Sequence, residues 1–405
     1  AYGRSEYGRD EKVMVEFVSA NPTGPMHMGN ARGGALGDCL AAVLDKAGYN
    51  AWREFYVNDA GNQIEKFGCS LEARYLQIFK GDEIEFPEDG YQGEDIKDLA
   101  KEYADLNGDS LVNVSAEERK KALVDYALPK NIKKMQADME KYKIFYDKWF
   151  FESELHKSGA VKAVVDLLTK KGLTYEKEGA VWYKNKEVLT QKLLKEGKSQ
   201  KYIDNLELKD DVLIRQNGNP TYFTADIAYH KNKFDRGFTT LIDVWGADHH
   251  GHVMRMKGAM DAIGYDGDKL NVVLMQLVKL VKDGELVRMS KRTGKAIQLG
   301  DLLDEVPVDS ARFLFNTKEA NTQMDFDLDL AVSQDNQNPV YYVQYAHARI
   351  CSIFKSLAKE GISPRECTDA ELALLTAPEE KELINHLASY TNEIISAAKD
   401  YDPTK

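Results

Sequence analysis

The sequence has no long hydrophobic run, since no stretch of 18 apolar residues occurs along its 405 residues. A helix that spans a membrane needs about 20 such residues, so we expect no membrane-spanning segment and no membrane partner. The first six residues are polar and show no signal-peptide pattern, and the chain does not begin with methionine. These absences favour a cytoplasmic protein, and residues 1–10 are interpreted as a linker remnant.

Cysteine is scarce, with four residues that lie far apart: Cys39, Cys69, Cys351 and Cys367. Because no Cys-x-x-Cys pair is present, the sequence predicts neither a zinc site nor a disulfide framework, and a reducing cytosol fits this usage. The histidines within residues 249–252 do not complete a zinc set either, because they fall on different helix faces and lack an acidic partner. We therefore predict no metal site in the protein.

Acidic residues outnumber basic ones by 66 to 54, which gives a net charge of −12. This charge argues against indiscriminate nucleic-acid binding, although local basic patches can still hold a specific RNA. Two lysine-rich stretches, residues 130–148 and 184–201, are candidates for such patches. Each stretch taken alone is better interpreted as a solvated helix face. The chain is long enough for two or three domains with sizeable cores.

One stretch organises the chain, residues 21–30, with the sequence Asn-Pro-Thr-Gly-Pro-Met-His-Met-Gly-Asn. The apolar run at 13–18 before it predicts a buried parallel strand, and the apolar spacing of residues 31–46 after it predicts a helix. Open α/β sheets bind ligands at the carboxyl ends of their strands, and a helix N-terminus attracts anions. The sequence therefore predicts an anion site at this turn.

Three residues of the turn have suitable chemistry. His27 can donate to a phosphate oxygen, Gly29 can let a purine approach the backbone, and Asn30 is a second neutral donor. The pattern is short, so alone it is better interpreted as an ordinary strand-to-helix turn with a surface histidine. A second stretch, Arg-Met-Ser-Lys-Arg at residues 288–292, changes this interpretation.

Together the two stretches resemble the His-x-Gly-His and Lys-Met-Ser-Lys-Ser/Arg signatures of class I aminoacyl-tRNA synthetases. Four further blocks narrow the resemblance to the bacterial-type arginyl-tRNA synthetases, in the order of that family: residues 15–25, 56–64, 245–252 and 338–349. The resemblance covers nearly the whole chain, from about residue 7 to 357.

The resemblance implies an α/β fold with a Rossmann-type parallel sheet of the class I synthetase kind, which a mainly helical insertion splits. The expected parts are the first half of the nucleotide-binding fold at 11–57, the insertion at 58–210, the second half at 211–330, and the start of an incomplete helical, anticodon-binding-like domain at 331–405. In the second half, residues 270–281 are predicted to form one strand that leads into a hairpin.

A long helix is predicted from residue 331 to 357. Tyr341, Tyr342, Tyr345 and Arg349 recur along it at helical spacing. Such spacing favours packing against a core, although a surface that faces tRNA would suit the same residues.

For ATP, the resemblance implies a site built from the two signature stretches. His27 and Asn30 would serve the α-phosphate, and Lys291 would be the mobile cation for the β- and γ-phosphates, with Mg²⁺ bridging phosphate oxygens. These three are the candidate catalytic residues. The remaining candidate ATP contacts are Gly29, Gly246, Asp248, Met289, Ser290 and Arg292. Asn30 departs from the family pattern, which has histidine there, but it still offers a neutral donor.

The arginine pocket must hold a planar cation, for which a carboxylate is the strong partner. Tyr222 and Asp226 lie four residues apart, on one face of a predicted helix. From the residues alone, a helix-capping role fits Asp226 as well as a ligand role does. The resemblance places Asp226 on the guanidinium with Tyr222 beside it. The other candidate arginine contacts are Asn21, His249 and Glu16.

The predicted function is that of a monomeric arginine–tRNA ligase that acts on ATP, L-arginine and tRNA(Arg). One alternative is a His-x-Gly-His nucleotidyltransferase, but such proteins are usually far shorter and lack the helix at 331–357. A second alternative is an inactive or truncated module that only binds arginine or tRNA. The short ends of the chain relative to the family, and Asn30, favour that alternative, whereas Lys291 and Asp226 argue against it.

Overall fold

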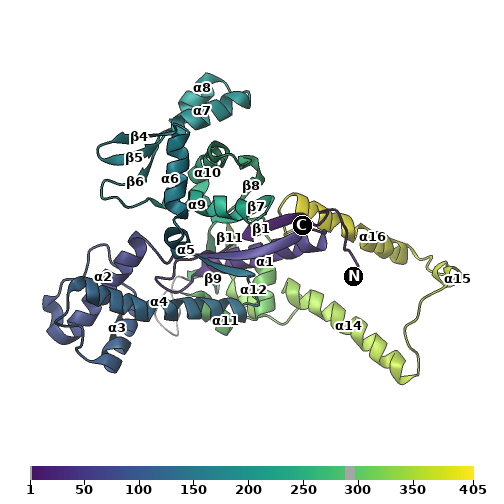
Figure 1. The fold of residues 1–405 in the computed structure, drawn as a ribbon. Coiled ribbons are helices and arrows are strands. Elements are labelled where there is room, and N and C mark those ends of the chain that lie inside the picture. Colours follow the sequence, from purple (N-terminus) through teal and green to yellow (C-terminus); the bar gives the residue numbers. More distant parts are fainter. Residues whose placement is uncertain (1, 288–296) are drawn as a thin grey trace.

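A five-stranded parallel sheet forms the centre of the computed structural model, which describes residues 2–287 and 297–405 (Figure 1). Its strand order is β3-β2-β1-β7-β8, and every neighbouring pair is parallel. The strands are β1 (Lys12–Glu16), β2 (Asn50–Val57), β3 (Lys148–Phe151), β7 (Thr240–Gly246) and β8 (Leu270–Met275). The predicted fold class, a parallel α/β sheet whose strands are separated by a long insertion, is confirmed.

Strand β1 is apolar because both faces of the sheet are covered. Val13 and Val15 belong to one hydrophobic core, whereas Met14, on the opposite face, belongs to a second core. Helix α1 (Met28–Lys46) connects β1 to β2 on one side, and β7 pairs with β1 on the other. The strand order therefore changes direction between β1 and β7, and ligands bind at such switch points.

Strand β3 was not predicted. It pairs in parallel with β2, so that Tyr56 lies opposite Phe150. The strand lies inside the range 58–210 that the sequence assigns to the insertion. The domain limits themselves stay a prediction.

Most of the segment between β2 and β6 lies outside the central sheet. Helices α2 (Asn62–Lys80), α3 (Glu94–Asn107) and α4 (Ala116–Lys141) pack on a separate core that contains Phe67 and Leu123. Helix α4 also supports the turn at 21–30, because Asn131 Nδ2 donates to the carbonyl of Pro22 at 2.8 Å. The insertion thus contacts the turn that carries His27.

Residues 152–214 include a three-stranded antiparallel sheet, β4-β5-β6, with helices beside it (Figure 1), and β6 lies beyond the predicted end of the insertion at residue 210. Their elements are α5 (Glu152–Lys157), α6 (Ala160–Lys170), β4 (Thr174–Lys177), β5 (Ala180–Tyr183), α7 (Asn185–Lys195), α8 (Gln200–Asn205) and β6 (Asp211–Ile214). Helix α7 packs against α10 (His250–Ile263) of the second half, so this sheet adjoins the central one.

The elements that follow β6 complete the central sheet and add a smaller one. They are α9 (Tyr222–Asp235), η2 (Ala247–His249), η3 (Gly267–Lys269), β9 (Val278–Lys282), β10 (Glu285–Val287), α11 (Leu299–Glu305), α12 (Val308–Phe315), β11 (Met324–Asp327) and α13 (Leu328–Val332). The prediction of one strand at 270–281 was wrong, since the chain leaves β8 and joins β10 and β11 as β9.

A remote contact accompanies this break. The buried guanidinium of Arg32 in α1 donates to the carbonyls of Gln276 and Thr322, both at 2.9 Å, and of Glu319 at 2.8 Å. Gln276 stands between β8 and β9, so a residue of α1 fixes the point at which the chain changes sheets.

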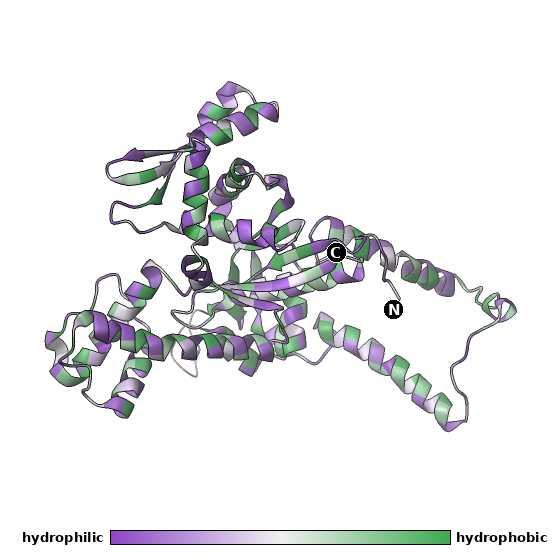
Figure 2. Ribbon diagram, viewed as in Figure 1, coloured by the Kyte–Doolittle hydropathy of each residue, from purple (hydrophilic) through white to green (hydrophobic). Residues whose placement is uncertain are grey.

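Helices α14 (Pro339–Lys359), α15 (Asp369–Leu372) and α16 (Pro378–Lys399) form an arm on the right of Figure 1. The end of α16 packs on α1, whereas only Val340 of α14 is buried. Both helices carry exposed apolar side chains, and their ribbons include residues coloured green for hydrophobic in Figure 2. The expectation of core packing was wrong here, because Tyr342 and Tyr345 are 60% and 45% exposed.

None of the helices in the described ranges is long and apolar enough to cross a membrane.

Candidate functional site

A cavity of about 1340 Å³ opens at the carboxyl ends of β1 and β7, where the topology predicts a ligand site. Seven of the predicted site residues line it: Glu16, Asn21, Tyr222, Asp226, Gly246, Asp248 and His249. His27, Gly29 and Asn30 are not among its lining residues, although Asn21 begins the same turn. The structure therefore brings the candidate arginine contacts together with the two candidate adenosine contacts.

His27 is the N-cap of α1. Its Nδ1 accepts a hydrogen bond from the backbone N–H of Gly29 at 3.2 Å. Because Nδ1 acts as an acceptor, the ring proton lies on Nε2, which is free to donate to an anion. The side chain is exposed, but desolvation by the surrounding protein still lowers its pKa. A neutral His27 with Nε2–H is thus suited to a phosphate oxygen.

Asn30 closes the same cap from the other side, since its Oδ1 accepts from the backbone N–H of His27 at 2.9 Å. The amide oxygen is occupied, which leaves Nδ2 as the donor end of the side chain. Gly29 keeps this arrangement open, because a Cβ on it would lie 3.1 Å from Cε1 of His27. The turn therefore presents two neutral donors at the N-terminus of a 19-residue helix.

The candidate residues Met289, Ser290, Lys291 and Arg292 lie outside the described residues. The described chain resumes beside the first motif, where Gln298 pairs with His27 in an isolated antiparallel bridge and Leu299 N donates to Met26 O at 2.9 Å. The described chain is therefore anchored at the His27 turn through Gln298 and Leu299.

Asp226 lies in the first turns of α9 and is 36% exposed to the cavity. Its Oδ2 accepts from Nε2 of His252 at 3.1 Å. Tyr222, one turn earlier, lines the same cavity and is also partly exposed. The sequence predicted His249 as the histidine at this end of the pocket, whereas the structure places His252 in contact with Asp226.

Glu152 is a buried carboxylate that the sequence prediction missed. It begins α5 directly after β3, accepts from the hydroxyl of Tyr56 at 2.8 Å, and bonds Nε2 of His156 at 3.1 Å. It lines an adjoining cavity of about 460 Å³ that shares Tyr222 with the larger one. Burial raises the pKa of Glu152, and the nearby charge of Asp226 adds to the effect. An acid directly after a strand was the available signal, but β3 itself was not recognised.

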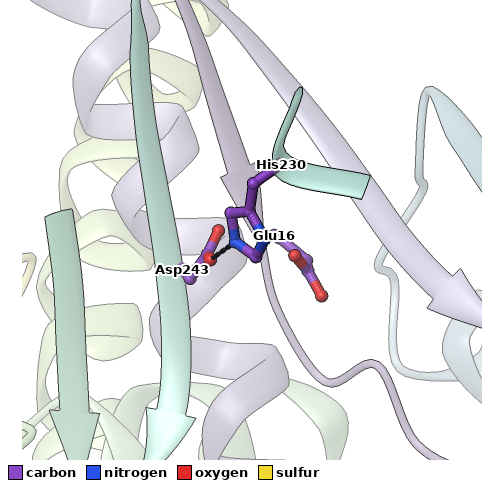
Figure 3. A group of neighbouring side chains, drawn as sticks. All are labelled: Glu16, His230 and Asp243. Carbon is purple, nitrogen blue, oxygen red and sulfur yellow. Dashed lines mark hydrogen bonds and ion pairs between the residues drawn. The ribbon is translucent and has the colours of Figure 1, made fainter. Parts of the chain in front are cut away.

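Glu16, another candidate arginine contact, belongs to a buried ionic network at the cavity wall. Glu16, His230 and Asp243 bring potential metal-ligand atoms within 4.8 Å of one another (Figure 3). However, the fully buried Lys233 donates to Glu16 and, at 2.8 Å, to Asp243. His230 Nε2 bonds Asp243 at 2.6 Å. An ammonium and an imidazole therefore already serve the two carboxylates.

The pKa values of the two acids follow from this network. Burial alone would raise the pKa of Asp243, but the charges of Lys233 and His230 lower it to about 2. For Glu16, burial outweighs the attraction of Lys233 and raises the pKa. Because Lys233 and Ser19 already donate to Glu16, its role in binding arginine stays a prediction.

Gly246 ends β7, Asp248 and His249 follow it, and all three line the cavity. The side chains of Asp248 and His249 are 81% and 61% exposed, and their nearest charged atoms are 3.7 Å apart. Neither side chain is fixed by a buried partner in the described structure. Both are therefore free to turn toward a ligand.

The family models cover the chain in two parts. The family described as tRNA synthetases class I (R), catalytic domain, matches residues 2–351, and the DALR anticodon binding domain matches residues 343–405. The chain belongs to the class I arginyl-tRNA synthetase family. Membership over nearly the whole chain removes the nucleotidyltransferase alternative.

Relatives within the arginyl-tRNA synthetase family agree with this assignment. The chain is 57% identical to an arginine–tRNA ligase of Ruminiclostridium cellulolyticum over 100% of this chain and 69% of the relative. It is 58% identical to that of Caldanaerobacter subterraneus subsp. tengcongensis, over 99% and 68%. A solved structure from Campylobacter jejuni, described as an arginyl-tRNA synthetase, matches with a TM-score of 0.78 and 34% identity over 99% and 85%.

Proposed function

We propose that the chain is an arginine–tRNA ligase. It activates L-arginine with ATP to arginyl-adenylate and transfers the arginyl group to the terminal adenosine of tRNA(Arg). Besides family membership, the observation that supports this proposal is the set of Tyr222, Asp226 and Glu152 around two adjoining cavities. Two carboxylates and a phenol suit a planar guanidinium, which presents five N–H donors.

Arginine would lie with its guanidinium between Asp226 and Glu152. The partial exposure of Asp226 and the desolvation of Glu152 leave negative charge that a cation can relieve. Asn21 would contact the α-amino or carboxylate end of the substrate from the turn after β1. This assignment leaves Glu16 in the wall, paired with Lys233.

ATP would bind across the motif turn, with its adenosine near Gly246 and Asp248. The Nε2–H of His27 and the Nδ2–H₂ of Asn30 would donate to the α-phosphate as the arginine carboxylate attacks. Lys291, assisted by Ser290 and Arg292, would neutralise the departing pyrophosphate, and Met289 would be a further contact to ATP. These donors are neutral or cationic, so they fit phosphate oxygens rather than a metal ion, and Mg²⁺ would be held chiefly by the phosphates of ATP.

The tRNA would be bound in part by residues 343–405, which match the DALR anticodon binding domain. As in class I enzymes generally, the 2′-hydroxyl of the terminal adenosine would attack the adenylate. The resemblance to arginyl-tRNA synthetases further implies that activation would require bound tRNA. We further propose that the protein acts as a monomer in the cytoplasm.

Arginine-dependent exchange of pyrophosphate into ATP, measured with and without tRNA(Arg), tests this function. The other nineteen amino acids serve as the comparison. Among the twenty amino acids, we expect only arginine to support exchange, and only when tRNA(Arg) is present. Exchange with another amino acid would contradict the pocket at Asp226, whereas arginine binding without exchange would favour the binding-module alternative.

Replacing His27 with alanine should lower the rate of adenylate formation about 100-fold, because one preorganised donor to the developing charge is lost. The KM values for ATP and arginine should change little, since the ground-state contacts remain. Single-turnover measurement of adenylate formation with saturating tRNA checks this prediction. An unchanged rate would remove His27 from the site. His386→Ala, on α16 and lining neither cavity, is the control for general effects of losing a histidine.

Arginine binding should release a proton near pH 5. The pKa of Glu152 is raised in the free protein, so part of the population is protonated there, and a guanidinium beside it favours the ionised form. Titration calorimetry at that pH should give an enthalpy that depends on the ionisation enthalpy of the buffer. The dependence should vanish near pH 8 and in Glu152→Gln, and its persistence in that variant would contradict the assignment.

A further inference from the structure

Asp226 is joined to the insertion by a chain of hydrogen bonds along the cavity wall. His252 Nε2 lies 3.1 Å from Asp226 Oδ2, and His252 Nδ1 lies 2.8 Å from Nη2 of Arg255. Nη1 of Arg255 pairs with Asp211 at the start of β6. All four residues line the cavity. Arg255 therefore contacts Asp226 only through the imidazole of His252.

The partners of His252 determine its protonation. A guanidinium has only N–H donors, so Nδ1 of His252 must accept from Arg255. The single ring proton then lies on Nε2 and is donated to Asp226. A second proton, on Nδ1, would point at the N–H of Arg255 at 2.8 Å. His252 is thus held as the neutral Nε2–H tautomer.

The side chains of Arg255 and His252 both pack against aromatic rings. The guanidinium carbon of Arg255 lies 5.3 Å from the ring centre of Phe223, and the imidazole lies 5.7 Å from Phe223 and 5.4 Å from Trp245. The charged groups that face His252 are Asp226 of α9, Arg255 of its own helix and Asp211 of β6. The two acids attract a proton to this site, and Arg255 opposes it.

We propose that Arg255 is a positioning residue that keeps His252 neutral, so that Asp226 retains its negative charge for the substrate guanidinium. The proposal rests on the proposed role of Asp226 in arginine binding. An imidazolium at position 252 would form an ion pair with Asp226, which is a stronger interaction than the hydrogen bond from a neutral ring to the same carboxylate. It would then compete with arginine for the carboxylate.

The test is the KM for arginine in tRNA aminoacylation at about pH 6 and about pH 8, which lie on either side of ordinary imidazole protonation. For each variant, the KM at the lower pH is divided by the KM at the higher pH. This ratio is then divided by the same ratio for the unsubstituted protein to give a quotient. In Arg255→Leu, His252 can take up a proton at the lower pH, so we expect this quotient to be about tenfold. Arg255→Lys keeps a donor, and its quotient should stay near one.

His252→Gln is the matched control, because an amide can donate to Asp226 and accept from Arg255 without titrating. Its quotient should stay near one whatever its KM for arginine at either pH, and the double variant Arg255→Leu with His252→Gln should lose the pH effect. A quotient near one in Arg255→Leu, or a pH effect that survives in the double variant, would overturn the proposal. Absence of arginine-dependent activity in the unsubstituted protein would instead overturn the proposed function.

Nitrogen-15 NMR of the unsubstituted chain gives a second measurement that does not depend on how Arg255→Leu folds. Two-bond proton–nitrogen correlations distinguish the histidine tautomers, and the signal lost in His252→Gln identifies His252. We expect the Nε2–H pattern, because Nδ1 accepts from Arg255 and Nε2 donates to Asp226. An Nδ1–H or doubly protonated ring at neutral pH would overturn the proposal.

Discussion

Replacing Asp226 with asparagine should raise the KM for arginine by about 100- to 1000-fold. The substitution preserves the shape of the side chain but removes the charge that pairs with the guanidinium, and breaking such a partly desolvated charged pair costs about 3 to 4 kcal/mol. His252 can still donate to the amide oxygen, so the wall of the cavity should be preserved. Steady-state aminoacylation over a range of arginine concentrations measures the effect.

The control for this prediction is ATP. Asp226 lies on α9, whereas the proposed phosphate donors lie at the start of α1, so the Kd for ATP should stay within about twofold of its value in the unsubstituted protein. A parallel loss of ATP binding would indicate that the variant has a folding defect, and the same criterion applies to Asp226→Ala. An unchanged KM for arginine in a folded variant would show that Asp226 is not the guanidinium ligand.

Replacing Lys233 with methionine should lower the free energy of unfolding by about 3 to 5 kcal/mol, because it leaves two buried carboxylates without their shared cation. Lys233 is fully buried and bonds both Glu16 and Asp243. Lys231→Met is the matched control on the same helix. Lys231 pairs with Asp235 near the surface, and its loss should change the free energy of unfolding by less than about 0.5 kcal/mol.

The pH dependence gives this prediction a sign. In the native chain the pKa of Asp243 is lowered from 3.8 to about 2, so its contribution to stability is present above pH 3.8 and is lost as the pH falls toward 2. Without Lys233, burial should raise the pKa of both acids, and stability should then fall as the pH rises from about 4 to 7. Urea unfolding from about pH 2 to about pH 7 measures both slopes. Equal stability of Lys233→Met and the native chain at pH 7 would contradict the network.

The parts that sequence alone predicted were those whose cause is local. The run at residues 13–18 is mainly apolar because strand β1 is buried on both faces of the sheet. The Pro/Gly turn at 21–30 then reverses the chain, so that helix α1 begins at Met28. By contrast, the edge strand β3 has only four residues, and its place is set by pairing with β2. The single strand at 270–281 was wrong because Arg32, far away in the chain, binds the carbonyl at the break.

The candidate site divides in the same way. Asp226 and Tyr222 were found from their spacing on one helix, and both line the cavity. Lys233, His252 and Arg255 gave no local signal, because their partners come from β1, β6, β7 and α9. The family resemblance indicated ligand contacts but not the tautomer of an imidazole or the network behind the wall.

The position of β1 between β2 and β7 has a consequence for synthesis on the ribosome. Glu16 emerges early, but its partner Lys233 lies 217 residues later, and the neighbouring strand β7 follows that lysine. Until those residues emerge, one edge of β1 has no partner and Glu16 has no counter-ion. Such non-local pairing is slow and aggregation-prone. The wall of the cavity must therefore close late, after the helical insertion has already had time to fold on its own core.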